Sequence, residues 1–411
     1  MNNVNIQNTS KGIKLTDLLI WVAFITNILR FAYSYINQPF VKNTLFNNTV
    51  VSNSNPNSQI STLLQAVFVA AVVALAIISF MKPIKCRSSA ALIMILVFFG
   101  VLWSIISIIS LHYDVLDVIN ANPSPVIMIL SVSVFIGFRE ELWDTVKKAI
   151  LLSSVSYTLI AAYETARFFA KYGFSVRLMT SGAIYALVSA IFLMYVNLLF
   201  SDQESLRKRK ILFISELLVL LLVSAILQSR SWVVHVVFLI IIWIVKITGS
   251  YRSKFLIFTI IVLTALIALA ISWEFILKIS GNLIGRLNTD SRTEQLKAFF
   301  DQVTFRDLLW GGGINASYFC FGTNYKFLDN LFFLTMFKFG LIPTLAYTLL
   351  LLSPIFYGLS HRKSQASKGI LFLIAWAACM FGLGIYISYS ITIYNIVIYI
   401  VIGRLYYLRS K

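Results

Sequence analysis

Charge is the property that this 411-residue sequence lacks most clearly. Charged residues make up 12% of the chain, whereas soluble domains carry about 25%. Hydrophobic residues make up 59%, and the mean hydropathy is +0.85. So few charges cannot cover the water-facing surface of a chain of this length, which excludes an ordinary soluble globular protein. The composition indicates a protein that is solvated by lipid.

Cysteine and histidine are also scarce, with three residues of each. Cys86, Cys320 and Cys379 lie far apart and form no CxxC pair, which argues against a metal cluster and against a disulfide framework. We therefore predict no metal and no cofactor. The N-terminal segment MNNVNIQNTSKGIK is polar and leads into a full-length apolar stretch, which argues against a cleaved signal peptide.

Apolar stretches long enough to cross a bilayer recur along the whole chain. A helix needs about 20 apolar residues to span a hydrocarbon core of about 30 Å, where it satisfies its own backbone polar groups. We predict an all-α integral membrane protein with about 12 transmembrane helices. The predicted spans are 15–36, 60–81, 89–111, 123–138, 149–166, 179–200, 211–228, 232–248, 255–277, 328–358, 369–388 and 391–407. The fourth is short, and the tenth is long enough to be kinked at Pro343 or to begin outside the hydrocarbon.

The positive charges of the short loops predict the orientation, because Lys and Arg concentrate in cytoplasmic loops. With the N-terminus inside, more than half of the 34 Lys and Arg residues fall on the cytoplasmic side. They lie at Lys11 and Lys14 and in segments 82–87, 139–148, 201–210, 250–254, 360–368 and 404–411. Both termini are therefore predicted to be cytoplasmic. This topology also accounts for the net charge of +18, so we predict no nucleic-acid partner.

Two segments on the opposite, external side differ in character. Segment 37–59 is rich in Asn and Ser, carries one charge and reads as a solvated connector. Segment 276–327 is the longest hydrophilic stretch and is predicted to form a large external loop. It divides the chain into nine spans at 1–275, the loop at 276–327, and three spans with a cytoplasmic tail at 328–411. The loop contains six cations, which the orientation rule disfavours outside: Lys278, Arg286, Arg292, Lys297, Arg306 and Lys326.

The middle of this loop has the pattern of an amphipathic helix. Leu296, Phe299, Phe300 and Val303 recur at spacings of three and four, which predicts a helix lying along the external membrane surface. Its wetter faces would carry Arg292, Lys297, Asp301 and Arg306. A glycine run then follows Trp310, where the backbone amides of Gly312 and Gly313 could approach a ligand closely. The same run is also an ordinary helix terminator.

A carboxylate stands at the entrance of the next apolar span, in the pair Asp329-Asn330. A charge at the membrane boundary must be solvated, paired or functional, because an isolated charge in hydrocarbon is costly. Asp329 could cap the helix that follows. Two further arginines are predicted on the same side, Arg230 in the turn QSRSW and Arg177 just before a span. Either could instead extend to a lipid phosphate.

Several arginines at one interface suit a pyrophosphate, because guanidinium stays charged and holds phosphate oxygens with two parallel hydrogen bonds. When a sugar–pyrophosphate bond breaks, negative charge builds on the leaving group, and each well-placed donor contributes about 3–4 kcal/mol. An aspartate that orients the attacking hydroxyl or takes its proton contributes about 10²–10⁴-fold. Asp290 and Glu294 are close enough in sequence to share an ion, but Arg286 and Arg292 beside them favour ion pairing.

These residues carry a resemblance to a known group. Ser229-Arg230, Arg292, Gly311–Gly313, Asp329-Asn330 and Gly340-Leu341-Ile342 resemble the loose pattern of bacterial O-antigen polymerases and O-antigen ligases. The resemblance covers roughly residues 177–345. It implies an inverting glycosyltransferase acting on undecaprenyl-pyrophosphate-linked oligosaccharide at the periplasmic face of the inner membrane, with a chain-length regulator protein as a possible partner. It assigns pyrophosphate binding to Arg230 and Arg292, and more weakly to Arg286 and Arg177.

Two alternatives remain open on the sequence. O-antigen ligases usually place a histidine where this chain has Asp329, which favours the polymerase and leaves the general base unidentified. His235 is the nearest histidine and reads as a packing or lipid-boundary residue. A lipid-linked oligosaccharide flippase should carry ionisable residues near the bilayer midplane in two repeated halves. Glu216 and Lys338 are the clearest such charges, and we find no internal repeat.

Overall fold

The computed structural model describes residues 14–43, 49–52, 58–81, 87–173, 176–178, 181–247, 291–360, 366–380 and 391–410. For Arg177, Arg230 and Arg292 it describes the backbone. The predicted span 255–277 and the candidate Arg286 lie outside the described residues, as does Asp290.

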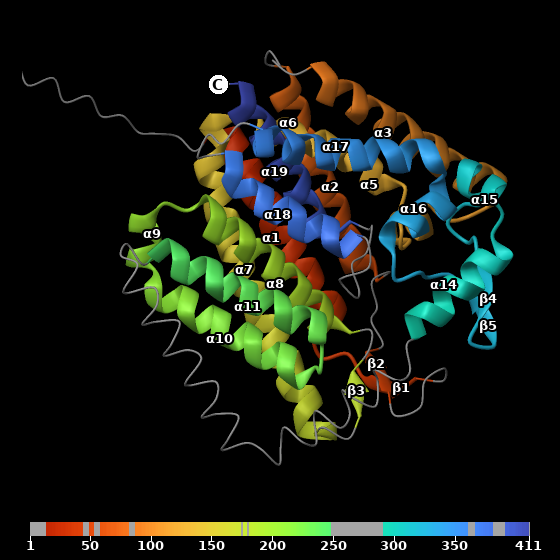
Figure 1. Cartoon of the computed structure of the whole chain (residues 1–411), viewed down its shortest axis with the longest axis horizontal. Helices are drawn as coiled ribbons and strands as arrows, with labels where there is room; N and C mark the ends of the chain where they lie inside the picture. The colour runs from red at the N-terminus through yellow and green to blue at the C-terminus, as the bar shows by residue number, and fades with distance from the viewer. Residues whose placement is uncertain are drawn as a thin grey trace, which may run out of the picture.

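Long apolar helices dominate the described part of the chain (Figure 1). Five are long and apolar enough to cross a membrane. They are α1 (Leu15–Tyr35), α2 (Gln59–Phe80), α3 (Arg87–Ile105, continued by a π-helical turn to Ser110), α7 (Glu140–Tyr172) and α8 (Gly182–Phe200). Shorter helices follow at α10 (Lys210–Ile226), α11 (Arg230–Ile247), α17 (Leu341–Ser360), α18 (Ala366–Ala378) and α19 (Ile393–Ser410). The predicted class, a helical membrane protein, is confirmed at this level.

Helix α8 forms the centre of the bundle. Every residue from Ala186 to Leu199 is buried, so this largely apolar helix contacts protein all around. Its Phe192 ring packs edge-on against Trp232 of α11 and Trp376 of α18. The core of the protein therefore lies along α8, and the neighbouring helices pack around it.

The predicted short span 123–138 consists of three consecutive pieces: α5 (Val126–Ile129), a 3-10 turn (Leu130–Ser133) and α6 (Val134–Gly137). Helix α6 crosses α19 so closely that a Cβ atom on Gly403 would collide with the carbonyl oxygen of Val134. Glycine at this position therefore allows two backbones to touch, which is how small residues join helices in membranes.

Segment 139–148, predicted to be a cytoplasmic connector, is the beginning of α7. Glu140 and Glu141 occupy the first turn, where carboxylates favour the helix dipole. Asp144 and Lys147 form an ion pair of 2.8 Å one turn further on. Because Leu142 is buried on the inner side, the polar sequence continues the helix rather than interrupting it.

The tenth predicted span is also divided, but not at Pro343. It forms α16 (Leu331–Phe339) and α17, and the break between them is Gly340. Pro343 lies in the first turn of α17, where its missing amide hydrogen removes no helical bond.

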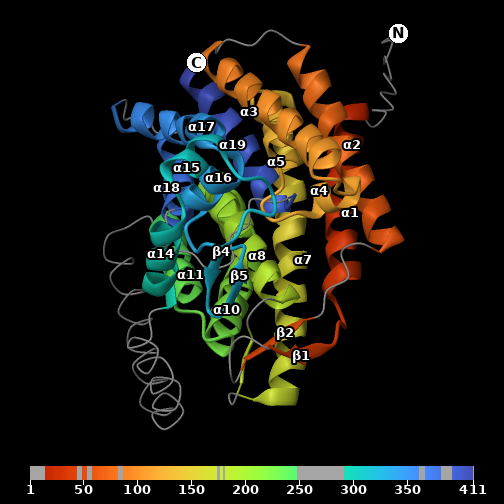
Figure 2. The same cartoon turned by 90° about the vertical axis from the view of Figure 1, so that its right-hand side faces the viewer.

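The two ends of the bundle carry different structures (Figures 1 and 2). At one end, Trp143 near the start of α7 packs against Phe200 at the end of α8, and Lys246 near the end of α11 donates to the carbonyl of Leu198. Helix α9 (Gln203–Lys208) follows there, so we call this the α9 end. The opposite end carries two small sheets and segment 291–340, and we call it the sheet end.

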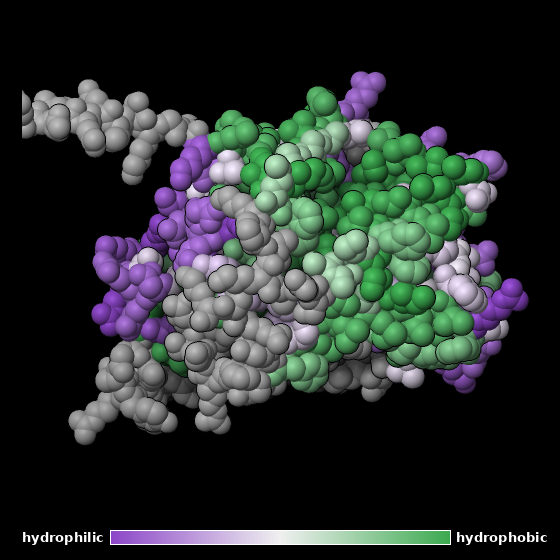
Figure 3. All heavy atoms as spheres, turned by 90° about the horizontal axis from the view of Figure 1, so that it is seen from above, coloured by the Kyte–Doolittle hydropathy of each residue, from purple (hydrophilic) through white to green (hydrophobic). Residues whose placement is uncertain are grey.

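Segment 37–59, predicted to be a solvated connector, contributes strands to the sheet end. β1 (Phe40–Lys42) pairs antiparallel with β2 (Thr49–Ser52), and β2 pairs in parallel with β3 (Arg177–Leu178). Val50 is buried between them, which explains the pairing of an otherwise polar segment. Figure 3 shows a broad hydrophobic surface on one side of the bundle, with hydrophilic residues gathered toward both ends.

Candidate functional site

Segment 291–340 folds against the sheet end of the bundle. It comprises α14 (Ser291–Gln302), α15 (Phe305–Trp310), β4 (Tyr318–Cys320), β5 (Thr323–Tyr325) and α16. The predicted apolar stripe of α14 exists, but its centre faces protein rather than a membrane surface. Phe299 is fully buried, and its ring lies 5.3 Å from those of Tyr318 and Phe337.

Two glutamines of α14 hold the rest of the segment in place. The Gln302 side chain forms the two hydrogen bonds that a paired strand would form with Phe319. Its amide oxygen accepts from the Phe319 amide, and its nitrogen donates to the Phe319 carbonyl, both at 2.8 Å. Gln295 is buried, accepts a hydrogen bond from the Asp329 amide at 3.3 Å and donates to the Tyr325 hydroxyl at 3.4 Å. The β4–β5 hairpin and the start of α16 are thereby fixed to one helix.

The Gln295 contact brings two of the predicted site residues together. Arg292 lies three residues before Gln295 on α14, and residues at that spacing are neighbours on a helix surface, about 5–6 Å apart at Cβ. The backbone of Asp329 is bound to Gln295 itself. Arg292 and Asp329 are 37 positions apart in the sequence, but they lie in neighbouring parts of one folded unit.

The helix cap at the start of α16 is Asn330, not Asp329. The Asn330 side-chain oxygen accepts a hydrogen bond from the Phe333 amide at 3.1 Å. Asp329 is half-buried and precedes the cap. Burial raises the pKa of Tyr318, and the carboxylate of Asp329 is among the nearby groups that add to this shift. Capping therefore does not account for the carboxylate at position 329.

The glycine run forms internal hydrogen bonds in this structure. Gly311 ends α15, and the amides of Gly312 and Gly313 donate to the carbonyls of Phe337 and Lys338 at 2.8 and 2.9 Å. These carbonyls belong to the last turn of α16, which would otherwise lack partners. A contribution of Gly312 and Gly313 to substrate binding would therefore come from the shape of the loop rather than from free amides.

Lys338 and Glu216, the two charges that a transporter could use, form hydrogen bonds in different parts of the molecule. Lys338 is fully buried and donates to the carbonyls of Ile314 and Ala316, at 2.8 and 2.5 Å, so it fastens the glycine loop to α16. Glu216 of α10 accepts hydrogen bonds from the hydroxyls of Ser154 and Thr158 on α7. Lys338 therefore belongs to the sheet end, and Glu216 to the contact between α7 and α10.

Arg177 and Arg230 also lie in elements of the sheet end. Arg177 is the first residue of β3, which is joined to β2 by the pairing of Thr49 with Arg177. Arg230 begins α11 directly after a tight turn in which the Ser229 amide donates to the Ser224 carbonyl at 3.0 Å. Because α11 ends beside α9, its beginning lies at the opposite end of the bundle.

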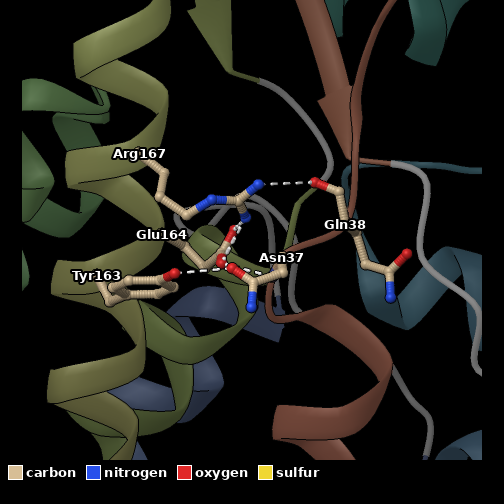
Figure 4. A network of polar contacts seen from close by, with 5 residues as sticks. All are labelled: Asn37, Gln38, Tyr163, Glu164 and Arg167. Atoms are coloured by element: carbon tan, nitrogen blue, oxygen red, sulfur yellow. Dashed lines mark hydrogen bonds and ion pairs between the residues drawn. The ribbon is translucent and has the colours of Figure 1, made fainter.

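A further arginine at the sheet end is already neutralised (Figure 4). Arg167 donates to both oxygens of the buried Glu164, at 2.8 and 2.9 Å, and its guanidinium lies 5.3 Å from the centre of the Phe40 ring. Glu164 also accepts from the Asn37 amide at 3.0 Å, and Tyr163 donates to the Asn37 side chain. This network fastens the chain that enters β1. Sequence reasoning missed it, although a Glu and an Arg three residues apart in an apolar helix were a visible signal.

His235 links three helices inside the bundle. One ring nitrogen lies 3.1 Å from the Tyr195 hydroxyl of α8, and the other lies 3.2 Å from the sulfur of Cys379, the residue directly after α18. These contacts fit the packing role predicted for it. In the part of the chain that the structure describes, no group of three or more His, Cys, Asp or Glu side chains could hold a metal ion.

Comparison of the chain with family models, with curated proteins and with solved structures finds no match. The function is therefore inferred from the residues and from their arrangement.

Proposed function

We propose that this protein is a metal-independent glycosyltransferase of the O-antigen polymerase kind. It joins undecaprenyl-pyrophosphate-linked oligosaccharide repeat units into O-antigen polysaccharide at the periplasmic face of the bacterial inner membrane. In this proposal the chain crosses the membrane about 12 times, both termini are cytoplasmic, and the sheet end, including 276–327, is periplasmic. The basic segments 139–148 and 201–210 then meet the cytoplasm at the α9 end.

One observation supports this assignment most strongly. Arg177, Arg230, Arg292 and Asp329 come from four separate stretches of the sequence, and their backbones all belong to elements of the sheet end. Within this set, Gln295 joins the helix of Arg292 to the backbone of Asp329. Arginines grouped with one carboxylate at a membrane boundary suit a lipid pyrophosphate and a sugar hydroxyl.

The proposed reaction is a single displacement at the anomeric carbon. The oxygen of an acceptor sugar hydroxyl forms a bond to that carbon on the growing chain, and the bond from the carbon to the pyrophosphate oxygen breaks. Its electron pair leaves with undecaprenyl pyrophosphate, whose growing charge Arg230 and Arg292 stabilise, assisted by Arg177 and Arg286. Asp329 orients the acceptor hydroxyl and takes its proton. Asn330, Gly312 and Gly313 shape the surface on which the substrate lies.

The direct test compares two cations of α14, Arg292 and Lys297. Arg292→Ala should abolish polymer while the protein remains inserted, because the leaving group loses a charged partner. Lys297→Ala is the matched control, since Lys297 is an exposed cation of α14 that the proposal leaves outside the site, and it should polymerise normally. Polymer is measured as the lipopolysaccharide ladder of complemented deletion cells. Equal ladders from the two variants would remove Arg292 from the site.

Asp329→Asn tests the carboxylate separately from the helix cap. The amide keeps the size of the side chain but cannot accept a proton, so chain growth should slow by about 10²-fold or more. Asn330 still caps α16 in this variant, so the fold should be kept. The measurement is the rate of polymer formation by purified protein with lipid-linked repeat units. A rate within twofold of the unchanged protein would show that Asp329 has no part in the reaction.

A further inference from the structure

Helix α15 leaves the aromatic rings at its two ends uncovered. None of its six residues is buried, and the large rings at its two ends, Phe305 and Trp310, are 73% and 67% exposed. This contrasts with α14, where the Phe299 ring is fully buried. Exposed aromatics of this size mark a surface that binds a partner when they belong to a contiguous apolar surface.

The apolar surface continues from α15 onto the spanning helices beside it. Ile342, Leu345 and Leu349 of α17 are all exposed, and their spacing of three and four places them on one face. Helix α15 approaches the start of α17 at the contact of Gly311 with Gly340. Ile105 and Ile109, near the end of α3, are exposed as well. Figure 3 shows hydrophobic surface on the side of the molecule where α3 lies in Figure 1.

The polar residues of α15 are exposed as well. Arg306 and Asp307 lie between the two aromatic residues and are exposed. The Asp307 carboxylate accepts from the amide of Thr304 at 2.9 Å and from its hydroxyl at 2.7 Å, which closes a capping box at the start of the helix. A short helix with aromatic rings, a cation and solvated polar groups is typical of the membrane–water interface.

We propose that α15 is an interfacial anchor that binds the phospholipid bilayer. Phe305 and Trp310 enter the boundary between headgroups and acyl chains, and Arg306 lies among the headgroup phosphates. The occupant is lipid rather than another protein, because the exposed surface is continuous with the outward faces of α3 and α17. The sequence pattern had suggested this position for α14, where Phe300 of the stripe is 51% exposed but Phe299 at its centre packs against Tyr318 and Phe337.

The anchor is joined stiffly to the candidate site. The amides of Gly312 and Gly313 bind the end of α16, and Lys338 binds the carbonyls of Ile314 and Ala316. The depth of α15 in the membrane therefore sets the depth of α16, which begins directly after Asp329 and Asn330. This consequence for the reaction rests on the proposed function, whereas the membrane contact of α15 does not.

Spin labels can measure this contact in the full-length protein. Single cysteines replace Phe305, Asp301 and Phe356 in a Cys86→Ser background, while Cys320 and Cys379 are buried and resist brief labelling. Asp301 is an exposed position of α14 and serves as the water-facing reference. Phe356 of α17 is 67% exposed and serves as the lipid-facing reference. The labelled proteins are placed in nanodiscs of phosphatidylcholine and phosphatidylglycerol.

The readout is the ratio of collisions with oxygen, which concentrates in lipid, to collisions with a water-soluble nickel chelate. We expect the label at 305 to have a ratio at least threefold above the label at 301 and below that at 356. A ratio at 305 equal to that at 301 would overturn the anchor. Each variant is first shown to be monodisperse by gel filtration, and a Trp310→Cys label repeats the test if Phe305→Cys fails this criterion. The measurement does not depend on polymer formation, so the anchor and the proposed function succeed or fail separately.

Discussion

Replacing Gly340 with alanine is expected to open the contact between the glycine loop and α16. Gly340 has a φ of +95°, and a Cβ atom there would lie 2.8 Å from the carbonyl oxygen of Leu309 and 2.9 Å from that of Trp310. Both are backbone atoms, which cannot turn away as a flexible side chain could. The backbone strain costs about 1–3 kcal/mol, and the overpacking costs about 1–3 kcal/mol more. The sum is about 2–6 kcal/mol against the closed loop.

Hydrogen exchange measures this opening at the bonds it breaks. The amides of Gly312 and Gly313 donate to α16, so their exchange reports separation of the loop from that helix. Each 1.4 kcal/mol raises the open fraction about tenfold, so exchange there should be at least about 25-fold faster in Gly340→Ala. Gly322→Ala is the matched control, since Gly322 also has a positive φ, of +74°, but nothing within 4 Å of the added Cβ. Wild-type exchange in Gly340→Ala, or an equal effect of Gly322→Ala at these amides, would refute the reasoning.

Three further perturbations test other contacts. Asn330→Ala removes the cap of α16 and should lower stability by about 1 kcal/mol, whereas Asp329→Asn should leave the thermal midpoint unchanged; equal shifts would contradict the assignment of the cap. Breaking a fully buried ion pair costs about 3–5 kcal/mol of folding stability, and Glu164→Ala should cost less than this because Arg167 is 28% exposed. Arg167→Ala should lower the stability less in the Glu164→Ala background than in the unchanged protein. Additive effects would show that the pair does not interact. The Thr304 side chain and amide hold the pKa of Asp307 below its ordinary value of 3.8, so its stabilisation of α15 is complete above that pH and is lost as the pH falls through the lowered pKa. Hydrogen exchange of the α15 amides should be slower in the unchanged protein than in Asp307→Asn above that pH, and the two rates should converge as the pH falls. A difference in rate that does not change with pH would contradict this role of Asp307.

The spanning helices were predictable because each is encoded by its own apolar run. Helix α1 was predicted at 15–36 and α2 at 60–81, and the structure begins and ends each within one residue of those bounds. Helix α7 is longer than the predicted span 149–166, because polar sequence before that span continues the helix. For the tenth span, a kink at Pro343 was one of two alternatives, and the break lies at Gly340 instead. A kink from Pro343 requires a helical turn before it, and α17 begins only at Leu341.

The arrangement of the candidate site was less accessible from sequence. Arg292 and Asp329 were singled out by their charge, but the residue that joins their segments, Gln295, is neutral and has no distinguishing pattern around it. Gln302 escaped notice for the same reason. The glycine run was visible, yet its partners are carbonyls of α16 about 25 residues later, and only the folded chain reveals such pairings.

The central claim, that this protein polymerises lipid-linked repeat units, is tested most directly by a gel of surface lipopolysaccharide. Cells that lack the gene are compared with the same cells after the gene is restored. We expect the ladder to collapse to the lipid core with a single repeat unit and to return on complementation, since export and ligation would continue without polymerisation. Loss of even the single unit would contradict the polymerase and indicate a flippase or a ligase.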